Sequence, residues 1–540
     1  MLTFKDMNPS KLFIIPLLLI LSSLSPVDQD ELIRQKVEML TAGIPVTVGD
    51  DPIYCGTVLP KFYQERQFKK AWSDKEAKEL IQTISNASEE GLNPGDYHLK
   101  MLLELQEKEM DQIMKAEFDL LLTDAFLLYA SHFLNGKINP ETVDSEWQAI
   151  RREGDAKLVL EEALDKGKVR EVLKDLAPNH IGYKGLRNAL KEYRAIADKR
   201  GWEMIPAGET LKPGMVDSVR VPLLIDRLKI SLDLKQTVSD RYIYSEQVAV
   251  AVKNYQIRNG LETDGNLGKL TTSSLNVPVE ERINQIIINM ERYRWAAEEM
   301  GSHYVIVNIA DYQMQVFRDK KKTFEEKVIV GKPFRKTPVF SSKMSYMVLN
   351  PTWTIPPTIL FNDILPETKK DPGYLVNKNI RVLSGQGSST TIIDPYTIDW
   401  SSLSKANFPY TLRQDSGPTN ALGAVKFMFP NKYNVYIHDT PSRELFNKTD
   451  RAFSSGCIRL NNPLQFASYL MHGRSDWTFE KIQQIVKDGK EQSVMLKEPL
   501  MVHIMYLTSW VSEGKVQFRS DLYERDRHIL KALGDPPPTI

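Results

Sequence analysis

The hydrophobic periodicity of the sequence changes near His303, and this change constrains the fold more than any other feature. Between about Trp72 and Arg200, apolar residues recur at helical spacing. From His303 onward, β-branched and aromatic residues form short runs of period two that are separated by turn residues. A chain of 540 residues is long enough for about three to four domains. We therefore expect a multi-domain α+β protein, helical in its N-terminal part and β-rich in its C-terminal part.

The helical part predicts a scaffold domain over residues 60–215. Ser73 to Glu76 has the pattern of a capping box, and apolar residues follow it at helical spacing. The stretch from Phe118 to Phe133 is apolar nearly all round, which indicates a helix buried among others. Ionisable residues do not cluster here in a way that suggests chemistry, so we expect this domain to have a supporting role.

A compact segment over residues 216–277 predicts a separate small helical module. Val248, Val252 and Tyr255 share one helical face. Gly260 stands where the end of a helix requires a left-handed conformation, and the pair Asp264-Gly265 favours a turn. The module lies directly before the region in which the periodicity changes.

The β-rich domain is expected over residues 303–527. Strand-like runs occur at 304–309, 313–317 and 327–330, and again near its end at 501–507 and 515–518. The domain contains an insert at about 350–415 that is rich in proline, glycine and serine and lacks a clear period. Long inserts in compact domains are usually lids or binding loops. We therefore expect the insert to cover a binding site.

The composition excludes several classes of function. The chain has 70 basic and 70 acidic residues, so no overall basic field indicates nucleic acid as a partner. Only two cysteines occur, Cys55 and Cys457, which excludes a disulfide framework and a cluster held by four thiolates. The eight histidines show no metal-binding spacing, and no nucleotide-binding or serine-hydrolase motif is present. We expect no metal and no cofactor.

The N-terminus indicates export. Lys5 and Lys11 precede an apolar run over residues 12–21 that is too short for a stable membrane-spanning helix, and small residues follow it. Residues 1–25 are therefore expected to be a signal peptide or an N-terminal anchor. The absence of a clear cleavage site leaves these two alternatives open.

His438 is the first candidate catalytic residue. In a strand that starts at Tyr433, side chains alternate, so that Tyr436 and His438 face away from the apolar side formed by Val435 and Ile437. This alternation argues against a histidine that simply packs in the core.

Cys457 is the second candidate. Gly456 before it permits a tight turn whose backbone N–H groups converge near the sulfur, as an oxyanion hole requires. The pair Asn462-Pro463 predicts a helix start, and a helix N-terminus would favour the thiolate. A cysteine nucleophile needs a histidine partner or such a dipole at neutral pH. Residue types and spacing alone leave open whether His438 and Cys457 cooperate or are unrelated.

Two resemblances to known families bear on this question. The segment from Tyr255-Gln256 to Leu275-Asn276 resembles the small three-helix peptidoglycan-binding domain, although loss of ligand binding stays an alternative. The segments Ile437-His-Asp-Thr-Pro441 and Ser454-Ser-Gly-Cys-Ile-Arg459 resemble the signature of L,D-transpeptidases with a YkuD-type catalytic domain. Together with the helical scaffold and the insert, residues 60 to 527 look like the large Gram-negative branch of that family.

The resemblance implies roles for individual residues. Cys457 would be the nucleophile, His438 the proton donor and acceptor, and Gly456 part of the oxyanion hole. Ser455 replaces the family's usual histidine, and its backbone carbonyl would orient His438. For substrate binding the resemblance and the strand pattern suggest Tyr436 in the groove, Trp353 in the insert as a cover, and Arg459 as a carboxylate ligand or as an ion pair that holds the turn.

The implied activity is a peptidoglycan L,D-transpeptidase that forms 3→3 cross-links between stem peptides and releases terminal D-Ala. Alternatives are an L,D-carboxypeptidase, a transpeptidase that attaches lipoproteins, or a non-catalytic peptidoglycan-binding scaffold. The implied partners are stem peptides, glycan and other cell-wall synthases, in the periplasm, with membrane contact only through an N-terminal anchor. The enzyme would be a carbapenem target. Because a bond to Cys55 would remove the nucleophile, we expect both cysteines to stay unpaired.

Overall fold

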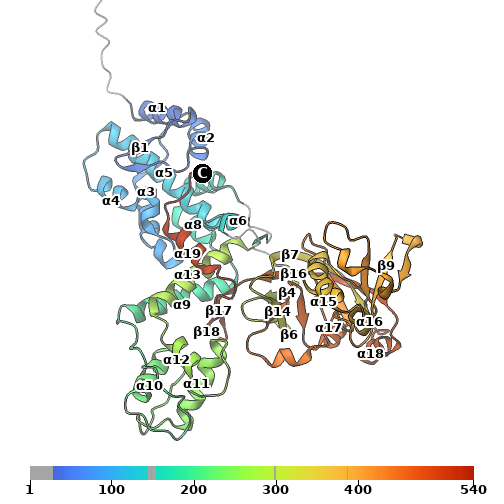
Figure 1. Ribbon diagram of the computed structural model, residues 1–540. Helices are drawn as coiled ribbons and strands as arrows, with labels where there is room; N and C mark the ends of the chain where they lie inside the picture. Colours follow the sequence, from blue (N-terminus) through green and yellow to red (C-terminus); the bar gives the residue numbers. More distant parts are fainter. Residues whose placement is uncertain (1–27, 144–146, 149–151, 153, 297–299, 386) are drawn as a thin grey trace, which may run out of the picture.

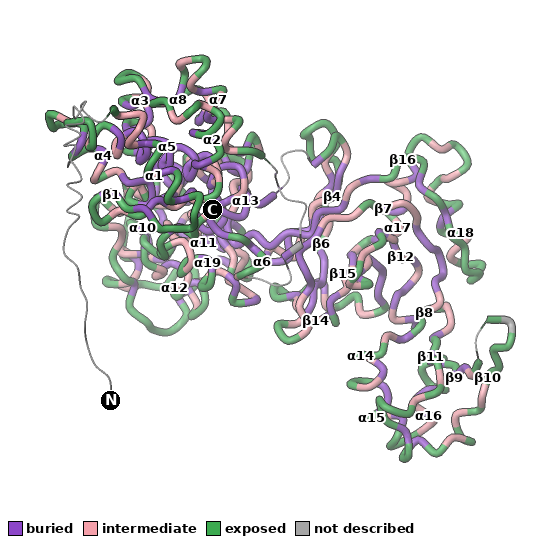
Figure 2. Tube along the Cα trace, turned by 90° about the horizontal axis from the view of Figure 1, so that it is seen from above, coloured by how far each residue is buried: buried purple, intermediate pink, exposed green. Residues whose placement is uncertain are grey.

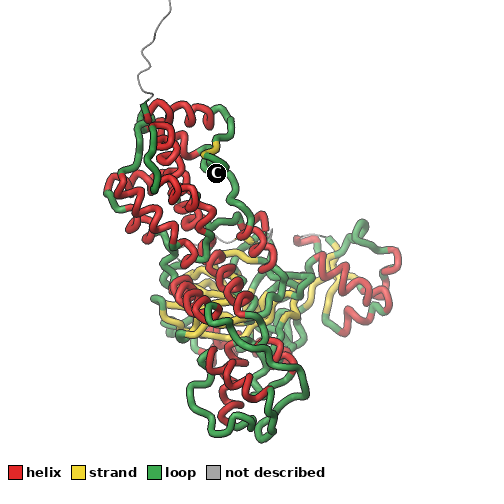
Figure 3. Tube along the Cα trace, turned by 90° about the vertical axis from the view of Figure 1, so that its left-hand side faces the viewer, coloured by secondary structure: helices red, strands yellow, loops and turns green. Residues whose placement is uncertain are grey.

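The structure is a computed structural model, and it describes residues 28–143, 147–148, 152, 154–296, 300–385 and 387–540. The expected signal peptide or anchor at residues 1–25 lies outside the described residues. The helical parts form a column, and the β-rich domain projects from its side (Figure 1). Coloured by secondary structure, both ends of the column are helical (Figure 3). The predicted multi-domain α+β fold is confirmed.

The N-terminal helices surround α5, which runs from Gln112 to Asn135 and is buried on nearly all sides, as its apolar sequence predicted. The capping box forms at the start of α3, where the side chain of Ser73 accepts from the backbone N–H of Glu76. The other elements of this part are α1 (Gln29–Thr41), β1 (Thr47–Val48), β2 (Asp51–Pro52), α2 (Val58–Glu65), α3 (Asp74–Ser85), η1 (Ala87–Glu90), η2 (Pro94–Tyr97), α4 (Leu99–Gln106), α6 (Pro140–Val143), α7 (Ala156–Lys166), α8 (Val169–Asp175) and α9 (Ile181–Ala197).

The small module has three helices, α10 (Arg220–Ile230), α11 (Glu246–Arg258) and α12 (Lys269–Leu275). Val248, Val252 and Tyr255 are buried in its core, as their shared helical face predicted. Gly260 and Gly265 both have positive φ, which matches the predicted helix end and turn. The long helix α13 (Val279–Trp295) then leads from the module toward the β-rich domain.

The main sheet of the β-rich domain closes on itself. Its strand order is β12-β13-β15-β6-β5-β4-β16-β7-β3, and β12 also pairs with β7, while β14 pairs with β6. Closure removes the exposed edges that an open sheet would present. Its strands are β3 (Trp147–Gln148), β4 (His303–Asn308), β5 (Gln313–Arg318), β6 (Lys321–Gly331), β7 (Val339–Leu349), β12 (Val425–Met428), β13 (Ile437–His438), β14 (Ala452–Ser454), β15 (Ile458–Leu460) and β16 (Gln492–Met505).

Two elements near the site differ from the prediction. The expected strand from Tyr433 is only two residues long, because Asn434 adopts a left-handed backbone conformation with φ of 55°. The predicted helix after Cys457 forms as α17 (Pro463–Leu470), but the side chain of Asn462 does not cap it. Instead, its amide donates to the carboxylate of Glu326 at 2.8 Å. The remaining elements of this domain are η7 (Arg443–Asn447) and α18 (Phe479–Asp488).

The insert is a small folded unit, not the irregular segment that its composition suggested. Its strands form a sheet of their own in the order β10-β9-β11-β8, and its apolar side chains form a separate core around Trp400 and Leu375. Figure 2 shows the insert set apart from the main sheet. Its elements are β8 (Trp353–Thr354), α14 (Pro357–Ile359), η3 (Leu360–Ile364), α15 (Leu365–Lys370), α16 (Gly373–Asn377), β9 (Ile380–Ser384), η4 (Gly387–Ser389), β10 (Thr391–Ile393), η5 (Pro395–Thr397), η6 (Trp400–Ser402) and β11 (Thr411–Gln414).

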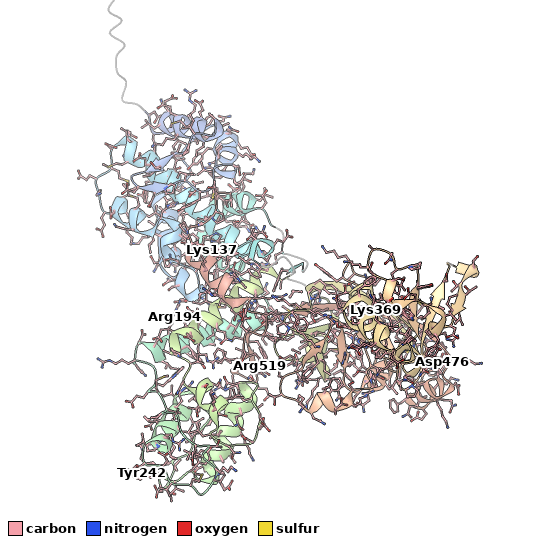
Figure 4. The ribbon with its side chains drawn as sticks, viewed as in Figure 1. Lys137, Arg194, Tyr242, Lys369, Asp476 and Arg519 are labelled. Atoms are coloured by element: carbon pink, nitrogen blue, oxygen red, sulfur yellow. The ribbon has the colours of Figure 1, made fainter. Side chains whose placement is uncertain are left out.

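The C-terminal segment returns to the helical column. The strands β17 (Ser509–Ser512) and β18 (Lys515–Phe518) form a hairpin of their own, so that 515–518 is not part of the main sheet. The side chains of Val516 and Phe518 pack with α9 and α13. Arg519 lies where the column meets the β-rich domain (Figure 4), and its guanidinium binds the carboxylate of Asp311 at 2.7 Å. The last helix is α19 (Asp526–Gly534).

Among the described residues, no helix combines the length and the apolar character that crossing a membrane requires.

Candidate active site

The two short strands β13 and β15 bring the candidate residues together. They pair in parallel, with Ile437 opposite Ile458 and His438 opposite Arg459. Ile437 and Ile458 both point into the main hydrophobic core. Because side chains alternate along a strand, His438 and Arg459 lie on the other face. The backbone bond from Ile458 N–H to the carbonyl of Tyr436, at 3.1 Å, continues the pairing by one residue toward Cys457.

This face opens into a cleft of about 1040 Å³. The insert forms one bank of the cleft, and the loop between β6 and β7 forms another. The C-terminal segment just before α19 contributes a third wall, although it is distant in sequence. The lining includes every predicted site residue except Gly456: Trp353, Tyr436, His438, Ser455, Cys457 and Arg459.

His438 is buried and held by its own backbone neighbour. Its Nδ1 lies 2.5 Å from the carbonyl oxygen of Asp439. A carbonyl only accepts, so Nδ1 carries the proton and Nε2 keeps its lone pair. Burial, and then the positive charge of Arg459, lower the pKa of His438 to about 3. The imidazole is therefore neutral at physiological pH, and it also makes a hydrogen bond with the backbone of Leu422.

The carbonyl that contacts Nδ1 of His438 is that of Asp439, whereas the family pattern suggested the carbonyl of Ser455 for orienting this imidazole. The carboxylate of Asp439 fixes the loop by accepting from the backbone N–H groups of Ala424 and Thr440, at 2.7 and 2.6 Å. Gly423 permits this arrangement, because a Cβ there would lie 2.3 Å from Asp439 and because its φ is +59°. Asp439, adjacent to the histidine, thus makes a contact that the family pattern suggested for Ser455.

Cys457 is half-buried and contacts Tyr436. Burial raises the pKa of the Cys457 thiol above its ordinary value, although hydrogen bonds from the backbone N–H and the hydroxyl of Tyr436 act in the opposite direction. The Tyr436 hydroxyl also interacts with the side chain of Trp353. The thiol lies 3.9 Å from the carbonyl oxygen of Asn434, a weak contact in which the S–H donates. Within the described part of the chain, no hydrogen bond joins His438 directly to the Cys457 sulfur.

Side-chain hydrogen bonds hold the turn that carries Cys457. The hydroxyl of Ser454 donates to the carbonyl of Cys457 at 2.5 Å and accepts from the N–H of Gly456 at 3.1 Å. The hydroxyl of Thr337, on the β6–β7 loop, donates to the carbonyl of Gly456 at 2.9 Å. The N–H of Gly456 is thus already engaged, which argues against its predicted place in an oxyanion hole. Gly456 instead supplies the turn itself, with φ of +114°.

Arg459 points into the cleft without an ion-pair partner among the described residues. Its Nε is buried and makes no hydrogen bond. Burial lowers the pKa of its guanidinium, while the nearby Cys457 acts in the opposite direction. Of the two roles expected for Arg459, an ion pair that holds the turn therefore does not occur within the described part of the chain. A guanidinium with unused donors suits a carboxylate ligand.

Several residues that line the cleft were not predicted from the sequence. Arg335 and Asp363 form an ion pair between the β6–β7 loop and the insert, with Nη1–Oδ2 and Nη2–Oδ1 distances of 2.5 and 2.9 Å. Lys336 donates to the backbone carbonyl of Tyr523 at 3.2 Å. No local pattern marks these residues, because they meet only through tertiary packing. Asp439, by contrast, directly follows the candidate histidine in the sequence, so the motif itself could have indicated it.

Both cysteines are free thiols in the structure. Cys55 is buried in the core of the N-terminal helices, where its sulfur lies 3.6 Å from the backbone carbonyl of Asp124. In the described part of the chain, no group of three or more His, Cys, Asp or Glu side chains could hold a metal ion.

Comparison with known proteins identifies two domains. Residues 302–483 match the model of the L,D-transpeptidase catalytic domain, and residues 57–190 match the model of a scaffold domain. The Haemophilus influenzae protein named "Putative L,D-transpeptidase" is 35% identical over 287 residues. These residues are 52% of this chain, and the chain spans only 57% of the length of that relative.

Solved structures of L,D-transpeptidases also align. The enzyme from Stackebrandtia nassauensis is 13% identical, with 56% of this chain and 97% of that chain covered and a TM-score of 0.22. The enzyme from Xylanimonas cellulosilytica is 14% identical, with 56% and 99% covered and a TM-score of 0.19.

Residues 302–483 are therefore similar to L,D-transpeptidase catalytic domains, and residues 57–190 are similar to scaffold domains. Cys457, His438 and Arg459 all lie within the residues that match the catalytic domain.

Proposed function

We propose that this protein is a peptidoglycan L,D-transpeptidase that forms 3→3 cross-links through an acyl-enzyme on Cys457. The observation that carries the proposal is the shared face of β13 and β15, on which His438 and Arg459 open into one cleft with Cys457. A neutral base, a thiol and an unpaired guanidinium are the groups that acyl transfer from an anionic peptide requires.

In the acylation step, Nε2 of His438 takes the proton of the Cys457 thiol, and the sulfur attacks the carbonyl of the third stem residue. The bond to the terminal D-Ala breaks, and its amine leaves with the proton from His438. In the second step, the side-chain amine of another stem attacks the thioester. Its proton passes to His438, an amide bond forms and the Cys457 thiol is regenerated. The third residue would be meso-diaminopimelate.

The oxyanion needs a donor other than Gly456. We assign this role to the backbone N–H of Cys457, for which no partner is present among the described residues. Removal of one such donor typically raises the barrier by about 2.7–4 kcal/mol. Arg459 would bind a carboxylate of the stem peptide, and Trp353 and Tyr436 would cover the reacting groups.

We further propose that the protein acts in the periplasm, and that residues 1–25 either direct it there as a signal peptide or hold it at the membrane as an anchor. Its substrates would be stem peptides on glycan, with the three-helix module near Tyr255 as a contact for the polymer and other cell-wall synthases as partners.

The decisive experiment incubates the purified protein with muropeptides that carry tetrapeptide stems and identifies the products by mass spectrometry. The proposal predicts 3→3 dimers and released D-Ala. Tripeptide monomers alone would favour an L,D-carboxypeptidase, and transfer to the lysine of a lipoprotein would favour the attachment reaction.

Carbapenem labelling separates an enzyme from a binding scaffold. We expect one adduct, located on Cys457 and absent from the Cys457→Ala variant. An adduct that persists in this variant, or no adduct on the intact protein, would contradict the catalytic assignment.

A further inference from the structure

The side chain of Arg335 contacts both the insert and the turn that carries Cys457. Its Nη1 donates to Oδ2 of Asp363 on the insert at 2.5 Å and also to Oγ of Ser455 at 2.9 Å. Its Nη2 donates to the other oxygen of Asp363 at 2.9 Å. A bidentate pair of this kind fixes direction as well as distance. Arg335 therefore connects η3 of the insert to the residue two positions before Cys457.

The position of this contact within the insert is significant. The other hydrogen bonds that fasten the insert to the main domain, within the described residues, leave from near its two ends. Asn350 donates to the carbonyl of Ile485 at 2.8 Å, and Ser416 donates to that of Gly489 at 3.1 Å. The pair between Arg335 and Asp363 instead crosses the cleft, since both residues line it from opposite banks.

The loop that carries Arg335 is itself tied to the catalytic turn. The N–H of Lys332 donates to the carbonyl of Ser454 at 3.0 Å. The hydroxyl of Thr337 donates to the carbonyl of Gly456 at 2.9 Å and accepts from the N–H of Gly331 at 2.9 Å. A displacement of this loop would therefore displace the turn on which Cys457 sits.

We propose that Arg335 is a positioning residue that couples closure of the insert, through Asp363, to the geometry of the catalytic turn, through Ser455. This inference rests on the proposed function and deepens it. With the pair formed, the insert covers the thioester and keeps water out until the acceptor amine attacks. With the pair broken, water reaches the thioester, and its addition yields the tripeptide acid and the free Cys457 thiol in place of an amide cross-link.

The exposure of the pair makes it sensitive to salt. The side chains of Arg335 and Asp363 are 17% and 42% exposed, so mobile ions screen their attraction. A surface pair of this kind is weak enough to open and close during turnover. The coupling therefore predicts a product distribution that depends on ionic strength.

The test compares full-length variants in the muropeptide assay and measures the ratio of tripeptide monomer to 3→3 dimer. Asp363→Asn keeps the shape of the side chain but loses its charge, and we expect the hydrolysed share to rise at least threefold. Arg335→Gln also loses the contact to Ser455, and we expect in addition a tenfold slower formation of the carbapenem adduct. The exchange Arg335→Asp with Asp363→Arg should return the product ratio toward that of the wild type.

The matched control is Arg381→Gln, which breaks an ion pair to Asp415 at 2.6 Å within the insert itself. We expect its product ratio to equal that of the wild type. Raising NaCl from 50 to 500 mM should increase the hydrolysed share of the wild type and leave that of Asp363→Asn unchanged.

If Asp363→Asn and Arg335→Gln give the product ratio of Arg381→Gln while Cys457 still forms its adduct, the coupling is wrong and the proposed function stands. If the wild type forms neither adduct nor product, the proposed function itself fails. The adduct therefore separates the two failures.

Discussion

At the scale of single residues, one cleft is lined by both a neutral thiol and a neutral imidazole. Burial raises the pKa of Cys457, and burial with the Arg459 charge lowers that of His438 to about 3. Neither group is charged at rest, so the proposed acylation would have to include the transfer of a proton from the sulfur to the imidazole nitrogen. Hydrogen bonds in unliganded active sites are often long and shorten when substrate binds, which is consistent with the missing direct bond between them.

This charge state predicts the pH dependence of Cys457 alkylation. The rate of reaction with iodoacetamide should still increase above pH 9, because burial raises the pKa of the thiol above its ordinary value of 9.0. Tyr436→Phe removes a hydroxyl that donates to the sulfur, so it should slow the reaction at pH 8 several-fold. The Cys457→Ser variant gives the background from Cys55. A plateau below pH 8 in the wild type would show that the thiol is activated at rest.

At the scale of elements, the insert is stabilised by contacts among its own residues. It has a separate sheet and a separate core, in which Trp400 is 3% exposed. A separate core keeps the shape of the insert independent of the main sheet, and this is the property that a cover for the cleft requires.

Trp400→Ala should therefore loosen the insert and leave the main sheet intact. Truncation of a buried tryptophan typically costs about 3–5 kcal/mol of folding free energy. Hydrogen exchange should show faster exchange over β9 and β11, with β4 and β5 unchanged. Tyr396→Ala is the control, because this aromatic residue of the insert is 64% exposed. Equal exchange in the two variants would show that the insert has no independent core.

At the scale of the whole molecule, distant segments meet around the catalytic domain. Arg292 of α13 binds Asp526 at 2.7 Å, and Arg519 binds both Asp311 of the β-rich domain and the carbonyl of Arg258 at the end of α11. The three-helix module, the column and the sheet are thus joined by a few buried or half-buried arginines. The C-terminal segment that they hold also lines the catalytic cleft.

Arg519→Ala should weaken this junction. Removal of one partner from a fully buried ion pair costs about 3–5 kcal/mol, and this pair is slightly exposed, so we expect roughly 2–3 kcal/mol. The melting temperature should fall, and small-angle scattering should report a larger radius of gyration. Arg474→Ala, which breaks an exposed pair to Asp476, should change neither. A shift no larger than that of Arg474→Ala would contradict the assigned role.

The sequence by itself determined where the regular helices and strands begin and which residues are candidates for the chemistry of the site. Periodicity located the helix α5 and the strands β4 and β5, because burial of one face imposes a fixed spacing on apolar residues. The motif around Cys457 predicted a nucleophile and a histidine partner, because the reactivity of such groups depends on residue type and local backbone. Local signals of this kind extend over only a few residues, so they can be recognised without knowledge of the fold.

Only the tertiary structure decided what surrounds these residues. That Asp439 and not Ser455 holds His438, that Gly456 is already hydrogen-bonded, and that Arg335 reaches both Asp363 and Ser455 all depend on chain segments that meet through packing. The insert lacked a clear period because its strands are short and its core is small, so its fold was not visible in the sequence. The pattern of residues fixes which groups can react, whereas contacts between distant segments decide which of them are aligned, covered and dry.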